Sequence, residues 1–301
     1  MSDAARRPAS AREGATKAVV TMLAAVALFC VMDAGLKQLS AHYPSIQVAA
    51  LRGAASLPLA LAWALMTTGW RSLLRVRWPL HALRGALGVM MIAAFVHGVR
   101  TLPLSTAYSI FFVAPLLITA LSGPLLGERV GRRRWIAIAI GLVGVLIVLR
   151  PTGEGVMTTA GLAVLLSALG YAVAAITVRV LASTDSTQAM VVWLMASMAA
   201  GAGALAAPGW VALRGEHAGL IAGVGIAGAL GQYAITEAFR MGEASLLAPL
   251  EYSALVWGAV LDLTLWHVLP DRVTWIGAAV IVASGWYLVR RDPVHAEAGH
   301  P

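Results

Sequence analysis

Three kinds of residue or motif are scarce in this chain of 301 residues, and each scarcity excludes a class of protein. Cys30 is the single cysteine, so neither an internal disulfide nor a cysteine metal cluster is expected. Charged residues make up 12% of the chain, against roughly 25% in soluble domains. Hydrophobic residues reach 59%. This composition excludes an ordinary soluble domain, because so much apolar surface needs lipid as its solvent.

Sequence motifs for chemistry are missing as well. There is no Walker A motif, which excludes direct drive by ATP. The chain has no HExxH, no GxSxG and no carboxylate cluster, so an intramembrane enzyme is a distant alternative, and no catalytic residue, metal or cofactor is expected. The net charge of +8 comes from short basic clusters without interleaved aromatic residues or zinc-finger spacing. Nucleic-acid binding is therefore not expected.

Long apolar runs follow one another along the chain with short connectors. A helix needs about 20 apolar residues to cross a bilayer. The sequence predicts an all-α membrane protein with ten transmembrane helices between loose tails at 1–17 and 291–301. The spans lie near 18–40, 46–67, 80–99, 104–126, 133–149, 158–181, 187–207, 217–238, 244–267 and 273–290.

Basic residues fall unevenly on the two sides of these spans. The groups Arg71–Arg77 and Arg132–Arg134 lie on the same side as the N-terminus, whereas the opposite side carries few lysines and arginines. Cytoplasmic loops are enriched in positive charge. We therefore expect a multi-pass protein of a bacterial-type inner membrane with both termini in the cytoplasm.

The second half of the chain repeats features of the first at a nearly constant offset. Arg100 and Arg240 follow spans three and eight, and Gln47 and Gln188 open spans two and seven. Five spans in each half invert the second copy relative to the first. The sequence thus predicts two inverted five-helix repeats, at 18–150 and 151–290, with a substrate site near the midplane, as in secondary transporters.

Several segments in this order resemble the EamA-type repeat of the drug/metabolite transporter superfamily, and most closely the YddG-like amino-acid exporter branch. They are MDAGLKQLS (32–40), QVAALRGA (47–54), PLLITALSGPLLGERVGRRRWIAIAIGLVGVLIVL (115–149), APLEYSALVWGAVL (248–261) and WIGAAVIVASGWYLV (275–289). The sequence departs from the family at Trp266-His267-Val268 and at Asp262. The resemblance implies export of amino acids or similar metabolites through a cavity between the halves.

Ionisable residues at membrane depth are costly and are candidates for function. Asp33 and Lys37 lie four residues apart on one helix face, as a local ion pair or as a pair that opens to bind a zwitterion or to gate. Arg52 either snorkels or pairs with Asp33 or a substrate carboxylate. For Glu251 three roles are open: it accepts hydrogen bonds that join the two halves, it contacts the substrate, or it couples transport to protons. His97 is either proton-linked or simply hydrogen-bonded.

Polar and aromatic residues in spans three, four, six, eight and nine are the expected substrate contacts: His97, Tyr108, Ser167, Tyr171, Gln232, Tyr233, Glu251, Tyr252 and Trp257. Pro115 and Pro249 occupy paired spans and are expected to bend them. The small-residue faces of spans five and ten, at Gly141–Gly144 and Gly277, favour close packing and allow a dimer. The chain is therefore expected to be a monomer or a homodimer.

The favoured function is a secondary transporter or facilitator that exports large neutral or aromatic amino acids, or similar small metabolites, by alternating access. Its partners are this small-molecule substrate and the lipid bilayer. The alternative is efflux of drugs or other cationic amphipathic metabolites on the same fold. Such an exporter needs an acid without a local cation, and Glu251 meets this condition.

Overall fold

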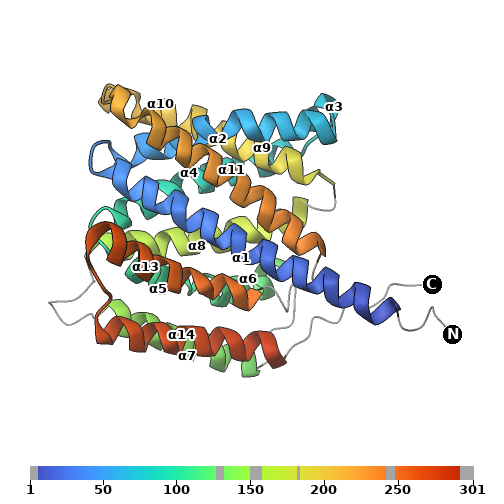
Figure 1. Ribbon diagram of the computed structural model, residues 1–301, viewed down its shortest axis with the longest axis vertical. Helices are drawn as coiled ribbons and strands as arrows, with labels where there is room; N and C mark the ends of the chain where they lie inside the picture. Colours follow the sequence, from blue (N-terminus) through green and yellow to red (C-terminus); the bar gives the residue numbers. More distant parts are fainter. Residues whose placement is uncertain (1–5, 127–131, 150–157, 182–183, 242–247, 292–301) are drawn as a thin grey trace.

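The computed structural model describes residues 6–126, 132–149, 158–181, 184–241 and 248–291, and every regular element within these ranges is a helix. The helices lie roughly side by side in one bundle (Figure 1). The first, α1 (Arg6–Ser40), begins at the same end of the bundle at which α14 (Arg272–Arg291) finishes. The all-α prediction is confirmed, whereas the predicted junction between the halves near 150 and the tail after 291 lie outside the described residues.

Between α1 and α14 the chain forms a succession of helices of unequal length. They are α2 (Ser45–Thr67), α3 (Trp70–Leu74), α4 (Trp78–Val99), α5 (Leu104–Phe111), α6 (Ala114–Leu126), α7 (Arg132–Leu149), α8 (Thr159–Leu181), α9 (Thr187–Ser197), the π-helix η1 (Met198–Ala202), α10 (Gly203–Ala206), the 3₁₀ turns η2 (Ala207–Gly209) and η3 (Gly215–His217), α11 (Ala218–Met241), the 3₁₀-helix η4 (Ala248–Ser253) and α13 (Ala254–Trp266).

Six helical segments of the described part are long and apolar enough to cross a membrane: Thr16–Ser40, Ser45–Thr67, Trp78–Val99, Thr159–Val178, Thr187–Gly209 and Gly215–Ile235. Helices suit this solvent because they satisfy all backbone hydrogen bonds within the segment. Three of the remaining predicted spans, near 104–126, 133–149 and 273–290, overlap shorter apolar helices, and the span near 244–267 contains η4 and α13. The count of ten spans and their inversion therefore stays a prediction.

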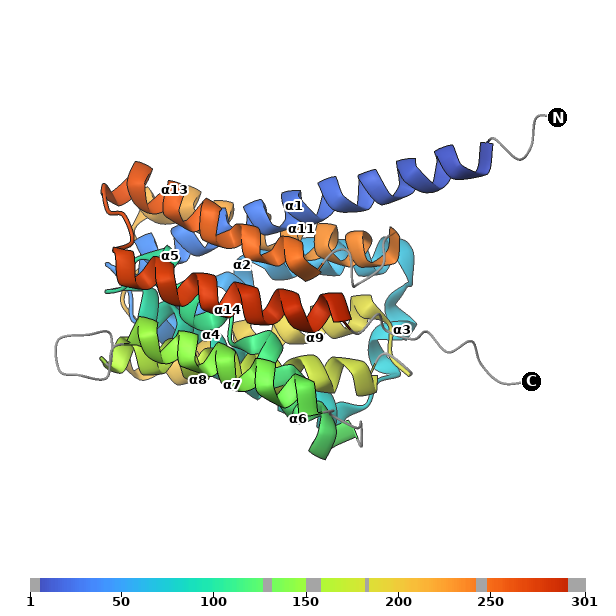
Figure 2. The same cartoon turned by 90° about the horizontal axis from the view of Figure 1, so that it is seen from below.

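The N-terminal tail is more ordered than expected, because α1 begins at Arg6 and projects beyond the bundle (Figure 2). Its first residues include Ala and Arg, which favour helix, and Pro8 lies in the first turn, where a missing N–H costs nothing. An Ala-rich polar segment that adjoins a long apolar helix can simply extend it.

The predicted fourth and ninth spans are each interrupted in the structure. The fourth is divided into α5 and α6, and Pro115 is the second residue of α6. In the ninth, η4 precedes α13, and Pro249 is the second residue of η4. Proline lacks the N–H that a continuous α-helix needs, so a helix start or a 3₁₀ turn suits it.

Neighbouring helices pair along much of their length. Helix α1 packs along α11, α4 along α8 and α7 along α14, while α2 contacts both α9 and α11. The α7–α14 contact brings two backbones together, since a Cβ on Gly144 would lie 3.0 Å from the carbonyl oxygen of Gly277 and one on Gly277 would lie 2.8 Å from that of Gly144. Small residues thus set this spacing, as expected from the sequence.

Candidate functional site

A half-buried carboxylate meets a buried phenol and a buried guanidinium where α1, α2 and α5 approach each other. The hydroxyl of Tyr108 on α5 donates a hydrogen bond of 2.9 Å to Oδ2 of Asp33 on α1. Arg52 on α2 attracts Asp33 electrostatically. Its Nε and Nη1 are buried and have no hydrogen-bond partner among the residues that the structure describes. The three groups form a charged cluster whose hydrogen-bonding capacity is incompletely used.

Aromatic rings lead from this cluster toward α8. The ring of Tyr108 stacks on Phe95 of α4 at 6.3 Å between centroids, and Phe95 meets Phe111 edge-on at 5.9 Å. Phe111 in turn lies 5.3 Å from Tyr171 of α8. We call Tyr108, Phe95, Phe111 and Tyr171 the aromatic chain. Rings at these separations attract one another and also attract flat or cationic ligands.

The far end of the aromatic chain carries a second carboxylate. Glu251 of η4 acts electrostatically on Tyr171, and among the described residues it has no hydrogen-bond or ion-pair partner. Ser167 lies one turn before Tyr171 on α8, and its hydroxyl is buried without a partner in the described part of the chain. Tyr252 packs edge-on against Phe112 at 5.0 Å. Charge and hydrogen-bonding groups therefore remain available beside Tyr171.

This arrangement suits binding rather than covalent chemistry. Carboxylates at both ends of the aromatic chain can accept hydrogen bonds from an ammonium group, the rings can stack on a flat moiety, and the Ser167 hydroxyl can donate to an oxygen. No group of three or more His, Cys, Asp or Glu side chains suited to a metal ion occurs in the described part of the chain.

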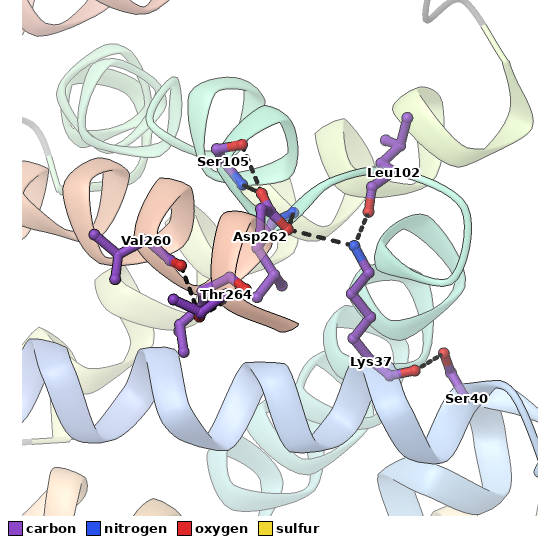
Figure 3. Close-up of polar contacts among 9 residues, drawn as sticks. Lys37, Ser40, Leu102, Ser105, Val260, Asp262 and Thr264 are labelled. Atoms are coloured by element: carbon purple, nitrogen blue, oxygen red, sulfur yellow. Dashed lines mark hydrogen bonds and ion pairs between the residues drawn. The ribbon is translucent and has the colours of Figure 1, made fainter. Parts of the chain in front are cut away.

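Lys37 does not pair with Asp33, although the two lie four residues apart on α1. Its Nζ lies 3.5 Å from Oδ1 of Asp262 on α13 and donates a 2.9 Å hydrogen bond to the carbonyl of Leu102 (Figure 3). It also lies 4.4 Å from the ring centroid of Trp266. Helix α13 supplies both the acid Asp262 and the ring of Trp266 beside Lys37. Packing between helices therefore decides the partner of Lys37, and its spacing from Asp33 along α1 does not.

Asp262 is a functional candidate that the sequence marked only as a departure from the family pattern. Its side chain is fully buried and caps α5: it accepts hydrogen bonds from the backbone N–H groups of Leu104 and Ser105, each at 2.9 Å, and from the Ser105 hydroxyl at 2.7 Å (Figure 3). Free N–H groups and the helix dipole favour an anion at this position. Two features of the sequence point to this cap: an acid within an apolar run at Asp262, and Pro103 directly before a helix that needs a cap.

We call this end of the bundle, where α1 finishes, the Lys37 end. Two further contacts join the halves there. The Gln47 amide exchanges two hydrogen bonds with the backbone of Val211, at 2.7 and 2.9 Å. The hydroxyl of Tyr43 lies 2.8 Å from Nδ1 of His217 and accepts a bond from the N–H of Arg214.

The opposite end, where α8 finishes, is the Asp185 end. Oδ2 of Asp185 lies 2.8 Å from Nε2 of His81 and accepts a hydrogen bond from the N–H of Arg77, the cap residue of α4. The Thr184 hydroxyl donates to Oδ1 at 2.7 Å. Burial acts to raise the pKa of Asp185, but the hydrogen bonds from Thr184, Arg77 and His81 outweigh it and hold the pKa below its usual range.

Four expected substrate contacts lie away from the aromatic chain. Trp257 is 41% exposed and Tyr233 is 47% exposed on the outer surface of the bundle, and His97 is exposed near the end of α4. Gln232 lines a side pocket with Tyr233. These helices are apolar on nearly every face, so the sequence pattern could not tell the inner face from the lipid face.

Comparisons with known proteins agree with the geometry of a membrane transporter. The EamA-like transporter family matches residues 16–150. A riboflavin transporter of Vibrio cholerae serotype O1 is 30% identical over 87% of this chain and 89% of its own length. A pseudopaline exporter of Pseudomonas aeruginosa is 27% identical over 85% of this chain and 90% of its own. An S-adenosylmethionine uptake transporter of Rickettsia felis is 25% identical over 69% of this chain and 71% of its own length.

The match to a solved crystal structure covers 92% of this chain and 98% of the other chain, with a TM-score of 0.64 and 20% identity. This match supports the fold. None of the three relatives is named for an amino acid, so the expected amino-acid exporter branch stays a proposal. The likeness nevertheless spans most of each transporter. The chain therefore belongs to the EamA-like transporter family of the drug/metabolite transporter superfamily and is a multi-pass membrane transporter of small metabolites.

Proposed function

We propose that the protein moves small metabolites with an amino group and a flat apolar part, and that large neutral or aromatic amino acids are its leading cargo. The observation that carries this proposal is the aromatic chain with a carboxylate at each end, Asp33 and Glu251. The rings match a flat side chain, and a carboxylate matches an ammonium group.

Glu251 is the proposed acceptor for the ammonium group of the cargo, because it lies near Tyr171 and has no cation partner in the described part of the chain. The cargo ring would stack against Phe111 and Tyr171, whose centroids lie 5.3 Å apart. The unpaired hydroxyl of Ser167 would donate to the cargo carboxylate. At the other end of the aromatic chain, the hydrogen bond from Tyr108 would hold Asp33 in place.

Alternating access between two inverted halves is the proposed mechanism. Under the repeat, α1 corresponds to α8 and α4 to α11, so the α1–α11 contact and the α8–α4 contact are equivalent. Helices α2 and α7 pack against their own counterparts, α9 and α14. A two-fold relation requires such pairing. The contacts at the Lys37 end and at the Asp185 end would then break in turn as the site opens to each side.

We assign both termini to the cytoplasm of a bacterial-type inner membrane, because Arg71, Arg75 and Arg77 lie at the Asp185 end, where α1 also begins. Export is the proposed direction. The named relatives include both an exporter and an uptake transporter, so direction is a property to be measured for this chain.

Counterflow in proteoliposomes tests the proposed cargo. Liposomes loaded with unlabelled tryptophan, phenylalanine or leucine should accumulate the labelled amino acid, and the E251Q and S167A variants should lose most of this uptake because the ammonium or carboxylate contact is gone. W257F changes an aromatic residue on the outer surface and serves as the matched control. Absence of saturable flux for every amino acid would exclude this cargo class.

Efflux of cationic amphipathic compounds is the second candidate, favoured by the same unpartnered Glu251. Such a cargo needs the carboxylate and the rings but not the Ser167 hydroxyl. In the counterflow assay a permanent organic cation would then be taken up equally by the native protein and by S167A, whereas E251Q would fail. An amino-acid carrier would respond to both substitutions.

A further inference from the structure

A pocket of about 180 Å³ opens between α2, α9 and α11, apart from the aromatic chain. Its lining includes Arg52, Leu59 and Trp63 from α2 and Leu230 and Tyr233 from α11. We call it the lateral pocket. It is smaller than the roughly 300–1,000 Å³ usual for a whole small-molecule ligand. It therefore suits one portion of a longer molecule.

Arg52 gives the lateral pocket its chemical character. It is the only charged side chain among the residues that line the pocket, and it is 8% exposed. Its Nε and Nη1 lack hydrogen-bond partners, and the nearby Ser56 hydroxyl donates to the carbonyl of Gly225. A buried guanidinium with unmade hydrogen bonds is costly. An acidic group that enters the pocket would meet this guanidinium as the only cation of the lining.

Apart from the neutral polar residues Ser56 and Gln232, the remaining wall is apolar or aromatic and reaches the lipid-facing surface. Leu59, Leu230 and Tyr233 are each a little under half exposed, and the ring of Tyr233 meets Trp63 edge-on at 5.8 Å. In a membrane-spanning bundle such side chains contact acyl chains. The pocket thus opens sideways into the bilayer, with a cation at its buried side and an apolar path outward.

We propose that the lateral pocket binds a single-chain acidic amphipath, whose carboxylate or phosphate contacts Arg52 while its chain follows Leu59, Trp63 and Tyr233 toward the lipid. A diacyl lipid does not fit this volume. The same chemistry could come from the bilayer, as a fatty acid or lysophosphatidate, or from an acidic amphipathic cargo. The site is separate from the proposed cargo site, and its existence does not depend on the cargo assigned there.

Binding in the lateral pocket is linked to the aromatic chain through Arg52. This side chain already attracts Asp33, which accepts the hydrogen bond of Tyr108. An acid bound to Arg52 competes with Asp33 for the same cation. Loss of the Asp33 charge should therefore strengthen binding of the amphipath, and loss of the Arg52 charge should weaken it.

Fluorescence quenching by a brominated fatty acid tests this site in purified protein held in a neutral maltoside detergent. Dibromostearic acid should quench Trp63 at concentrations about tenfold lower than its methyl ester, because only the acid can accept a charge-assisted hydrogen bond. The chain has 10 tryptophans, so the W63F variant supplies the background signal to be subtracted. Equal quenching by acid and ester would overturn the proposal.

Three variants sharpen the experiment. R52Q should bring the acid to the affinity of the ester, and D33N should tighten binding of the acid about fivefold without changing that of the ester. A229L places a larger side chain on the pocket wall and should weaken both probes, so it keeps the test decisive if R52Q does not fold. An unchanged preference for the acid in R52Q, or unchanged quenching in A229L, would contradict the site.

The source of the ligand is decided by competition. If the bilayer supplies it, lysophosphatidic acid should displace the brominated acid, while an amino acid that the protein transports in counterflow should not. Complete, competitive displacement by the transported cargo would instead assign the lateral pocket to the transport pathway and overturn its separation from the cargo site.

Discussion

Two buried aspartates, at opposite ends of the bundle, perform related tasks with different partners. Asp262 caps the start of α5 and Asp185 accepts the N–H of the cap residue of α4. Each thereby ties a residue of the second half to a helix start in the first. At the Lys37 end the cation beside the aspartate is an ammonium, whereas at the Asp185 end it is an imidazole, charged only when protonated.

The difference teaches what each contact depends on. Asp262 receives three hydrogen bonds from α5 itself, so its contribution comes from the helix end with Lys37 as an addition. Asp185 receives one backbone bond, one hydroxyl bond and the His81 contact, and lies in the loop before α9. We expect the Lys37 end to depend mainly on capping and the Asp185 end to respond more to proton concentration.

The largest expected effect comes from D262A. The substitution leaves two buried backbone N–H groups of α5 without their acceptor and Lys37 without its counter-charge, which costs about 3–5 kcal/mol. Thermal unfolding in detergent should show a melting temperature about 10 °C lower than that of the native protein.

The paired variant K37M/D262N separates the two roles of Asp262. If neutralising Lys37 were its main task, removing both charges would restore most of the lost stability. We expect less than half to return, because the carboxamide that replaces the carboxylate cannot satisfy all three donors of α5. Full recovery would contradict the capping interpretation.

The second prediction concerns acid and Asp185. Because its folded pKa lies below the unfolded value of about 3.9, Asp185 adds stability that is complete above that value and is lost as the pH falls through the folded pKa. D185N should lower the melting temperature at pH 7 by a few degrees and flatten its decline below about pH 4. Parallel curves for native and D185N protein would show that the carboxylate contributes nothing through its ionisation.

The smallest expected effect is that of S105A, which removes one of the three donors that α5 offers to Asp262. Both backbone bonds and the Lys37 contact persist, so the loss is about 0.5–1.5 kcal/mol. A melting shift of a few degrees, well short of that of D262A, would support this ranking. A shift as large as that of D262A would mean that the hydroxyl, not the helix end, holds the aspartate.

Much of the fold could be read from the sequence because runs of about 20 apolar residues dictate where helices form. The expected spans near 46–67 and 158–181 coincide closely with α2 and α8. An acid within an apolar run is costly unless it is protonated, paired or facing water, so the sequence makes Glu251 a candidate. In the structure Glu251 acts electrostatically on Tyr171, and the role of both residues in substrate binding stays a prediction.

Partner choice could not be read in the same way. The spacing of Asp33 and Lys37 predicted a pair, yet Lys37 reaches Asp262 on another helix and Asp33 reaches Tyr108. Spacing along a helix reports which residues share a face and is silent about the helix packed against it. Trp257 illustrates the related difficulty that, in a helix apolar all round, the lipid face and the inner face look alike.

The cap on α5 also has a consequence for biosynthesis. Ser105 and Asp262 are 157 residues apart, so the ribosome has made the first half long before the acceptor exists. Until α13 has been made, the backbone N–H groups of Leu104 and Ser105 lack the carboxylate that accepts them in the folded protein. The first half of the chain therefore completes its folding only after synthesis of the second half, although most of its helices are available long before.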